Sequence, residues 1–210
     1  MSDLVFYTNP MSRGRLVRWL LEEIGQPYRT EIVAYGAPMK SPEYLAINPM
    51  GKVPALVHGT SLVTECPAIC AYMAETFPEA GLAPTAEERA AYYRWLFFAA
   101  GPVEAALFNH TLGVEVPDEL RGRSGYGSYK AVLDVLQQAV AANPYLAGQR
   151  FTAVDIYVGT MIGWGMRFEA MEERPGFADY VARISAREAY VRANALDDAA
   201  LEQPEDSTAT

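Results

Sequence analysis

The spacing of apolar residues changes along the chain and predicts two parts of different architecture. Residues 4–7 form a short apolar run typical of a buried strand, and Asn9-Pro10 ends that run as a turn. From Ser12 the apolar residues follow a helical period, and Gly25 predicts the end of this helix. Residues 28–33 then alternate like a second strand.

A hairpin and a further helix complete the first part. Residues 41–47 are expected to hold a short helix. The runs 53–57 and 61–64 are predicted to be strands joined by a short turn, which indicates a hairpin. A helix is predicted from Pro67, because proline is well tolerated in a first turn, to about residue 77. The order of strand, helix, strand, hairpin and helix indicates an α/β domain.

Beyond a linker at residues 78–84 the strand signals vanish and helical periods follow one another. We expect two domains, an α/β domain at 1–78 and an all-helical domain at 86–202. The polar, acidic tail at 203–210 is expected to be disordered. The helices of the second domain are predicted at 92–107 with a kink at Pro102, 129–140, 154–164, 177–185 and 187–201.

Composition and charge exclude several classes of partner. The chain has 210 residues, half of them hydrophobic, and a net charge of −9. A nucleic-acid-binding protein would need a clustered excess of Lys and Arg, and the cluster of Arg13, Arg15 and Arg18 is interpreted as a solvated helix face or a small-anion site. No stretch approaches the roughly 20 apolar residues of a membrane span, and no signal-peptide pattern is found. We therefore expect no nucleic-acid or membrane partner.

The cysteines and histidines predict neither a disulfide nor a metal site. Cys66 and Cys70 lie four residues apart and form no disulfide framework, which favours a reducing, cytoplasmic location. Cys70 is interpreted as a small buried hydrophobic residue. His58 and His110 stand far apart and not near the cysteines in a ligand spacing. The prediction is a cytoplasmic protein without a metal.

One segment of the first domain has the features of a ligand site. The Val53-Pro54 bond precedes a buried strand and is a candidate for a cis peptide, although only about 5–6% of such bonds in folded proteins are cis. A helix that starts after Glu65-Cys66 points backbone N–H groups and its positive end at whatever lies before it, which suits a carboxylate. Glu65 could take an ammonium group of the same ligand. A zwitterionic amino-acid end therefore fits this segment.

Several motifs together resemble a known family. The run from Asn48 to Leu56, NPMGKVPAL, and the run from Leu62 to Ile69, LVTECPAI, closely resemble the glutathione-binding half of cytosolic glutathione transferases. Residues 7–25 are similar to the first strand and helix of that family. Residues 151–155, FTAVD, are similar to the capping-box segment of its helical domain, in which Thr152 and Asp155 begin a helix. The resemblance covers nearly the whole chain.

The resemblance implies a thioredoxin-like α/β domain followed by an all-α helical bundle, with glutathione as the substrate. The Val53 backbone, before a cis Pro54, would pair with the cysteinyl part of glutathione. Glu65 and Cys66 would hold its γ-glutamyl end. The glycine carboxylate would meet Lys52, with Lys40 as a further candidate.

Cys66 stands where the family usually has serine. A thiol is a weaker hydrogen-bond donor than a hydroxyl, and cysteine is not a preferred helix cap. Binding there is expected to depend more on backbone N–H groups.

Two residues compete for the role of activating the glutathione thiol. Members of the family use Ser, Tyr or Cys at the first strand–helix junction, and this chain offers Ser12 and Tyr7. Ser12 resembles the serine-type pattern, since it follows a proline-containing turn and opens the helix. Counting back from Arg18 favours Tyr7, whereas counting back from Gly25 reaches Gly14, which suits neither. We prefer Ser12, although Ser12 as a helix cap and Tyr7 as a core residue are the simpler interpretations.

The predicted function is conjugation of glutathione thiolate to small hydrophobic electrophiles, a detoxification reaction, in a cleft between the two domains. By the resemblance the protein is expected to be a homodimer packed through the first two long helices. Three alternatives stay open. One is another glutathione-dependent activity, such as that of a peroxidase, isomerase or dehalogenase. The others are a non-catalytic binding or regulatory protein and a carrier of hydrophobic ligands.

Overall fold

The computed structural model describes residues 4–202, so the predicted tail at 203–210 lies outside the described residues. Contacts divide the chain into two compact units. The first comprises the chain up to Met73 and again from Arg187 onward, and the second is Ala74–Ala186. The division into domains at 1–78 and 86–202 stays a prediction; the contacts group the last helix with the first unit.

The first unit is built on a four-stranded mixed sheet with the order β2-β1-β3-β4. β1 pairs in parallel with β2 and antiparallel with β3, and β3 and β4 form the predicted hairpin. The β3 strand begins two residues later than predicted, because Pro54 has no N–H to donate to the ladder. The strands are β1 Leu4–Thr8, β2 Arg29–Ile32, β3 Ala55–His58 and β4 Ser61–Thr64.

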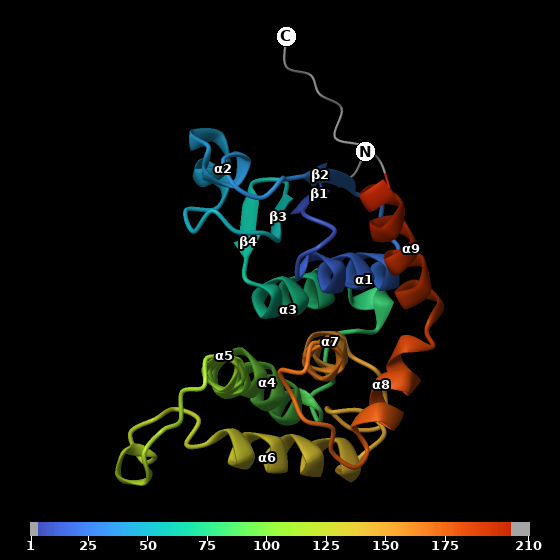
Figure 1. The fold of residues 1–210 in the computed structure, drawn as a ribbon. Coiled ribbons are helices and arrows are strands. Elements are labelled where there is room, and N and C mark those ends of the chain that lie inside the picture. The colour runs from blue at the N-terminus through green and yellow to red at the C-terminus, as the bar shows by residue number, and fades with distance from the viewer. Residues whose placement is uncertain (1–3, 203–210) are drawn as a thin grey trace. The chain divides into compact units, whose positions relative to one another are not determined.

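Helices cover both faces of this sheet (Figure 1). Along β1 the residues Leu4, Phe6 and Thr8 are fully buried, while Val5 and Tyr7, on the opposite face, are half-buried. One face of the sheet carries α1 Gly14–Ile24 and α3 Cys66–Thr76, and the other carries the 3-10 turn η1 Pro38–Lys40 and α2 Pro42–Ile47. The predicted thioredoxin-like α/β domain is confirmed.

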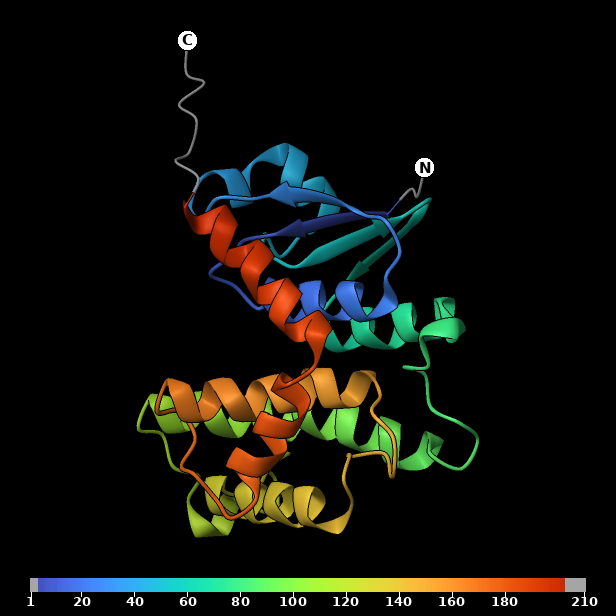
Figure 2. The ribbon, with the colours of Figure 1, turned by 90° about the vertical axis from the view of Figure 1, so that its right-hand side faces the viewer.

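The last helix, α9 Glu188–Glu202, packs along α1 (Figure 2). As a result α1 is buried on nearly all sides, and even Arg18 is only 4% exposed. Because α9 follows the whole second unit in sequence, this packing joins segments almost 180 residues apart.

The second unit is helical, and in residues 86–186 the structure shows no strand beyond one isolated bridge, Tyr145 to Gly148. The predicted helix at 92–107 is divided by a π-helical turn that contains Pro102, which has no N–H to donate and crowds the preceding turn. The elements are η2 Pro78–Ala80, α4 Arg89–Phe98, the π-helical η3 Ala99–Val103, α5 Glu104–Thr111, η4 Asp118–Leu120, α6 Tyr129–Ala142, α7 Ala153–Arg167 and α8 Phe177–Ser185.

The helix α7 is the buried centre of this unit, as its nearly uniform apolar sequence predicts. It contacts α4 and α8. Its start is the predicted capping box, in which Thr152 and Asp155 satisfy each other's backbone N–H groups. The predicted helical domain is confirmed.

Candidate functional site

Strand register brings three chain segments to one end of the sheet. Tyr7 of β1 pairs with Ala55 of β3, and Ala55 pairs with Thr64 of β4. The loop that leaves β1, the Val53-Pro54 segment and the Glu65-Cys66 segment therefore start from neighbouring positions. The residues predicted from the sequence to bind glutathione lie in or beside these segments, except Lys40. Lys40 ends η1 and contacts the loop before Val53 through Met50 and Gly51.

The Val53-Pro54 peptide bond is cis, as expected. The carbonyl before it, Lys52 O, accepts from Tyr44 Oη at 2.7 Å and from Asn48 Nδ2 at 2.7 Å. Burial raises the pKa of Tyr44 to about 12, so the hydroxyl stays a donor at neutral pH. Among the described residues no hydrogen-bond partner is found for the N–H or C=O of Val53. A main-chain donor and acceptor are thus open to an extended ligand, in the manner of an added strand.

Glu65 stands at the turn from β4 into α3 with a φ of +66°, in the left-handed region that non-glycine residues seldom adopt. Its carbonyl accepts the N–H of Ile69 at 2.9 Å, which begins the helix. Its side chain is exposed and, among the described residues, forms no hydrogen bond or ion pair. A carboxylate is thereby presented beside the positive end of α3, where a ligand with both charges fits.

Cys66 is the first residue of α3 and is 7% exposed. Cys70, one turn later, is fully buried, and burial raises the pKa of its thiol well above the ordinary value. This confirms the interpretation of Cys70 as a small core residue. Cys66 alone of the two cysteines reaches the helix start.

The two candidate lysines differ in their contacts. Lys40 Nζ donates to Met50 O and to Gly51 O, each at 3.0 Å, and so closes the loop ahead of Val53. Lys52 is exposed, and within the described residues its ammonium has no partner. Lys52 therefore has its full donor capacity for a ligand carboxylate, whereas Lys40 has one N–H left.

Ser12 lies in the loop between β1 and α1 and is half-buried. Its hydroxyl donates to Asn9 O at 2.6 Å and accepts the N–H of Gly14 at 2.9 Å. A Cβ on Gly14 would lie 1.8 Å from Thr8 Oγ1, so this close turn requires glycine. The residue that caps α1 is Arg13 and no side chain caps the helix, so the Ser12 hydroxyl stabilises the turn before the helix instead of capping it. The hydroxyl lies at the sheet end where the other segments meet.

Tyr7 points to the other face of the sheet. Its ring packs against a hydrophobic cluster of Val33, Met39 and Tyr44, and its centroid lies 6.0 Å from that of Tyr44. The core role considered for Tyr7 is thus present. These structural contacts of Ser12 and Tyr7 do not decide which of the two residues activates a thiol.

The interpretation of the N-terminal arginines as a solvated face or anion site is wrong for Arg18. It is buried against α9, where Arg18 Nε donates to Asp197 Oδ1 at 2.7 Å. Burial raises the pKa of the Asp197 carboxyl, although the guanidinium opposes this. The sequence did contain a signal for this burial. Arg18 lies four residues after Gly14 and three before Leu21, and therefore on the same helix face as these two buried residues.

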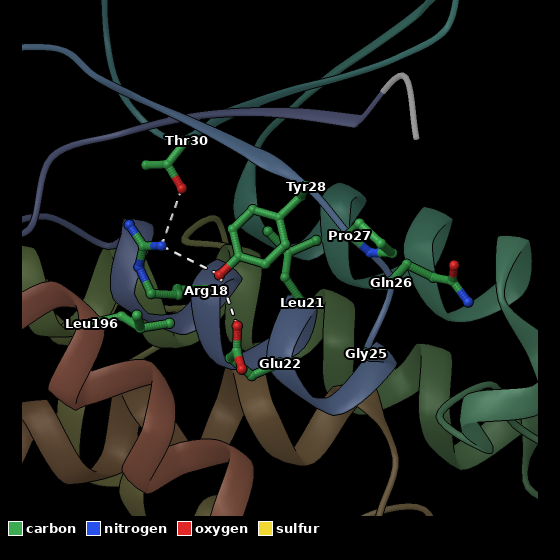
Figure 3. Close-up of a pocket in the computed structure, with 9 residues that line it drawn as sticks. All are labelled: Arg18, Leu21, Glu22, Gly25, Gln26, Pro27, Tyr28, Thr30 and Leu196. Carbon is green, nitrogen blue, oxygen red and sulfur yellow. Dashed lines mark hydrogen bonds between the residues drawn. The ribbon is translucent and has the colours of Figure 1, made fainter. Parts of the chain in front are cut away.

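A pocket of about 450 Å³ opens beside Arg18 within the first unit (Figure 3). Four of its polar side chains bond to one another: Arg18 Nη1 lies 3.3 Å from Tyr28 Oη and 3.2 Å from Thr30 Oγ1, and Tyr28 donates to Glu22 at 2.8 Å. Burial raises the pKa of Tyr28 to about 12. Because these groups form hydrogen bonds with one another, they contribute to the packing of α1 and do not present open donors to a ligand.

Two kinds of feature are absent from residues 4–202. No helix there has the length and apolar character that a membrane span requires. No three His, Cys, Asp or Glu side chains gather there as a metal site would need.

Comparison with known proteins agrees with this geometry. The family model described as "Glutathione S-transferase, N-terminal domain" matches residues 11–76, and the model described as "Glutathione S-transferase, C-terminal domain" matches residues 127–188. The first match contains Ser12, the cis-proline segment and the start of α3.

Individual relatives extend the match. The chain is 35% identical over 167 residues to glutathione S-transferase GST-4.5 of Xanthomonas campestris pv. campestris, covering 75% of this chain and 80% of the relative. A crystal structure of a glutathione transferase from Methylococcus capsulatus has a TM-score of 0.76 and 26% identity, covering 93% of this chain and 99% of that one. A theta-class glutathione S-transferase from Xanthomonas axonopodis pv. citri, solved with glutathione bound, has a TM-score of 0.68 and 30% identity, covering 92% and 97%. On these grounds the chain belongs to the glutathione S-transferase family.

Proposed function

We propose that the protein is a glutathione transferase that joins the sulfur of glutathione to an electrophilic carbon of a small hydrophobic second substrate. The observation that carries the proposal is that two open groups and the Ser12 loop meet at one end of the sheet. The open groups are the Val53 main chain before cis Pro54 and the Glu65 carboxylate at the start of α3. The theta-class relative solved with glutathione supports the same ligand here.

Each part of glutathione would meet a group of matching chemistry. The cysteinyl N–H and C=O would pair with the Val53 main chain. The γ-glutamyl ammonium would meet Glu65, and its carboxylate would meet Cys66 and the start of α3. The glycine carboxylate would meet Lys52, while Lys40 holds the loop through Met50 and Gly51.

Ser12 would lower the thiol pKa by donating to the sulfur. A free thiol has a pKa near 8.5, and each unit by which it falls corresponds to about 1.36 kcal/mol. The Ser12 hydroxyl now donates to Asn9 O, which also accepts the N–H of Ser12 at 2.9 Å. Turning the hydroxyl toward a thiolate would therefore leave Asn9 O with a partner, and the change carries little penalty. The thiol proton would pass to solvent. The thiolate would then attack the electrophilic carbon, so that the C–S bond forms as the bond to the leaving group breaks, for example with departure of chloride from a chloro-nitroaromatic compound.

The test is the absorbance of bound glutathione thiolate against pH. Wild type and Tyr7→Phe should show a lowered thiol pKa, and Ser12→Ala should lose most of it. Ser61→Ala, an exposed serine on β4, is the matched control and should behave as wild type. Loss in Tyr7→Phe instead would assign the role to Tyr7. A wild-type thiol pKa that is not lowered would refute the transferase mechanism.

Turnover then separates this activity from other chemistry at the same site. Conjugation of a chloro-nitroaromatic compound supports the transferase, whereas reduction of a hydroperoxide without conjugation favours a peroxidase. Glutathione binding without any turnover in wild type favours a non-catalytic protein.

We further propose that the protein is a cytoplasmic homodimer with a role in detoxification. Phe97 of α4 is 69% exposed, and an exposed aromatic side chain of this size suits a protein contact. Phe97→Asp should convert a dimer into a monomer in analytical ultracentrifugation. A wild-type protein that sediments as a monomer would exclude the homodimer.

A further inference from the structure

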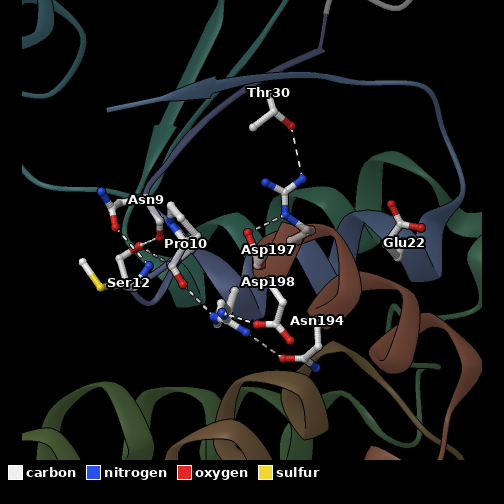
Figure 4. A network of polar contacts seen from close by, with 12 residues as sticks. Asn9, Pro10, Ser12, Glu22, Thr30, Asn194, Asp197 and Asp198 are labelled. Carbon is white, nitrogen blue, oxygen red and sulfur yellow. Dashed lines mark hydrogen bonds and ion pairs between the residues drawn. The ribbon is translucent and has the colours of Figure 1, made fainter. Parts of the chain in front are cut away.

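The guanidinium of Arg15 joins the loop that carries Ser12 to the last helix. Its partners Pro10, Asn194 and Asp198 are seen in Figure 4. Arg15 Nε donates to Pro10 O at 2.6 Å. From the same side chain Nη1 donates to Asn194 Oδ1 at 3.2 Å and Nη2 donates to Asp198 Oδ1 at 2.7 Å. A planar guanidinium has donors in fixed directions, so its partners on α9 set the direction from which it holds the loop.

The bond to Pro10 fixes the backbone immediately before Ser12. Pro10 O and the N–H of Met11 belong to one peptide group, and that N–H donates to Asn9 Oδ1 at 3.0 Å. Arg15 and Asn9 thus hold opposite edges of one peptide plane. The next peptide group is held in the same way, because Met11 O accepts from Tyr35 Oη at 3.3 Å and Ser12 N donates to Asn9 O.

Helix α9 is itself anchored on α1 by contacts that do not involve the loop. Arg18 pairs with Asp197 at 2.7 Å, and Arg187 pairs with Glu23 at 2.6 Å. The partners of Arg15 on α9 are therefore held in place independently of Arg15. Of the ion pairs that Arg15, Arg18 and Arg192 form between α1 and α9, that of Arg15 belongs to a side chain that also bonds to the loop.

We propose that Arg15 is a positioning residue for Ser12, through which the packing of α9 on α1 sets the orientation of the loop that presents the Ser12 hydroxyl. The proposal rests on the proposed function of Ser12. It assigns to the last helix, far from Ser12 in sequence, a part in the activation of glutathione. Arg15 itself need not touch the substrate.

The experiment compares Arg15→Gln with Arg192→Gln. Arg192 reaches Glu22 from α9 at 3.3 Å, so its loss also removes an α1–α9 ion pair but no bond to the loop. We expect Arg15→Gln to lower kcat/KM by about ten- to a hundredfold, since small displacements of a reacting group have effects of this size. The apparent pKa of the bound glutathione thiol should rise in Arg15→Gln and stay at the wild-type value in Arg192→Gln.

A second readout does not depend on glutathione. Amide hydrogen exchange at Ser12 and Gly14, whose N–H groups bond to Asn9 O and Ser12 Oγ, should be faster in Arg15→Gln than in wild type or Arg192→Gln. If Arg15→Gln does not fold, Asp198→Ala replaces it. This variant keeps the bond from Arg15 to Pro10 but removes the acceptor of Arg15 Nη2, and it should shift both readouts in the same direction by less.

The outcomes separate this inference from the proposed function. A wild-type thiol pKa that is not lowered refutes the proposed function and, with it, the effect on glutathione. If the thiol pKa is lowered in wild type and equally in Arg15→Gln, but not in Ser12→Ala, the positioning role of Arg15 alone is overturned. Unchanged exchange at Ser12 and Gly14 in Arg15→Gln also overturns it.

Discussion

Two helix starts in this molecule each carry an acidic residue and use it differently. At the start of α7, Asp155 is fully buried, and its carboxylate accepts from Leu146 N, Thr152 N, Thr152 Oγ1 and Tyr180 Oη at 2.8–3.1 Å. At the start of α3, Glu65 is exposed in a left-handed conformation, and among the described residues its carboxylate has no partner.

The difference separates a structural acid from a proposed binding acid. Buried polar groups in native proteins are almost always hydrogen-bonded, and Asp155 follows this rule completely. Glu65 keeps an unfavourable backbone conformation, and among residues 4–202 its side chain forms no hydrogen bond or ion pair that would offset this; such residues gather at functional sites. A carboxylate at a helix start therefore stabilises the fold in the second unit, whereas in the first unit the corresponding carboxylate is open to a ligand.

The largest effect is expected from Asp155→Ala. The substitution leaves several buried donors without an acceptor, so the free energy of unfolding should fall by roughly 3–5 kcal/mol. Chemical denaturation followed by circular dichroism measures it. The control is Asp179→Ala, an exposed acid in the first turn of α8, which should change the value by less than about 0.5 kcal/mol. Equal effects in the two variants would contradict the role given to Asp155.

Glu65→Gln should act on binding instead. It removes the charge that would meet the ligand ammonium while preserving size and backbone, so the Kd for glutathione should rise by about ten- to a hundredfold. The free energy of unfolding should stay within about 0.5 kcal/mol of wild type. Calorimetric titration with glutathione gives the first value. An unchanged Kd would remove Glu65 from the proposed site.

Glu65→Gly should stabilise the protein while it weakens binding. Glycine adopts a φ of +66° without the steric energy that glutamate has in this conformation. That steric energy is larger than the free energy that glycine loses through its greater conformational entropy in the unfolded chain. We expect a gain of about 0.5–1 kcal/mol in thermal or chemical unfolding. Glu65→Ala keeps the unfavourable conformation and serves as the control. A Glu65→Gly protein less stable than Glu65→Ala would show that the backbone conformation carries no strain.

The smallest effect is expected from Cys66→Ser. A hydroxyl is a stronger donor than a thiol and a better helix cap, so glutathione affinity should rise by about two- to fivefold. The comparison variant is Cys70→Ser, which places a hydroxyl in the core, should cost stability and should leave affinity unchanged. A lower affinity in Cys66→Ser would mean that the thiol itself is favoured at this position.

Several elements could be predicted because their signals are local. The change from strand to helix after Thr8, the hairpin at β3 and β4 and the capping box at Thr152 and Asp155 all depend on residues close together in sequence. The order of these elements was enough to predict both the α/β domain and the helical domain. The same local motifs indicated the segments that strand register brings together.

The sequence alone thus determined the elements, the two architectures, the family and the segments that form the proposed glutathione site. Only the tertiary structure decided what surrounds them. It buries Arg18 against Asp197 of α9, 179 residues away, and links Arg15 both to Pro10 and to Asp198, which lies 183 residues away. The physical reason is that turns, caps and periodicity act between near neighbours, whereas burial and ion pairing depend on which distant helix packs alongside.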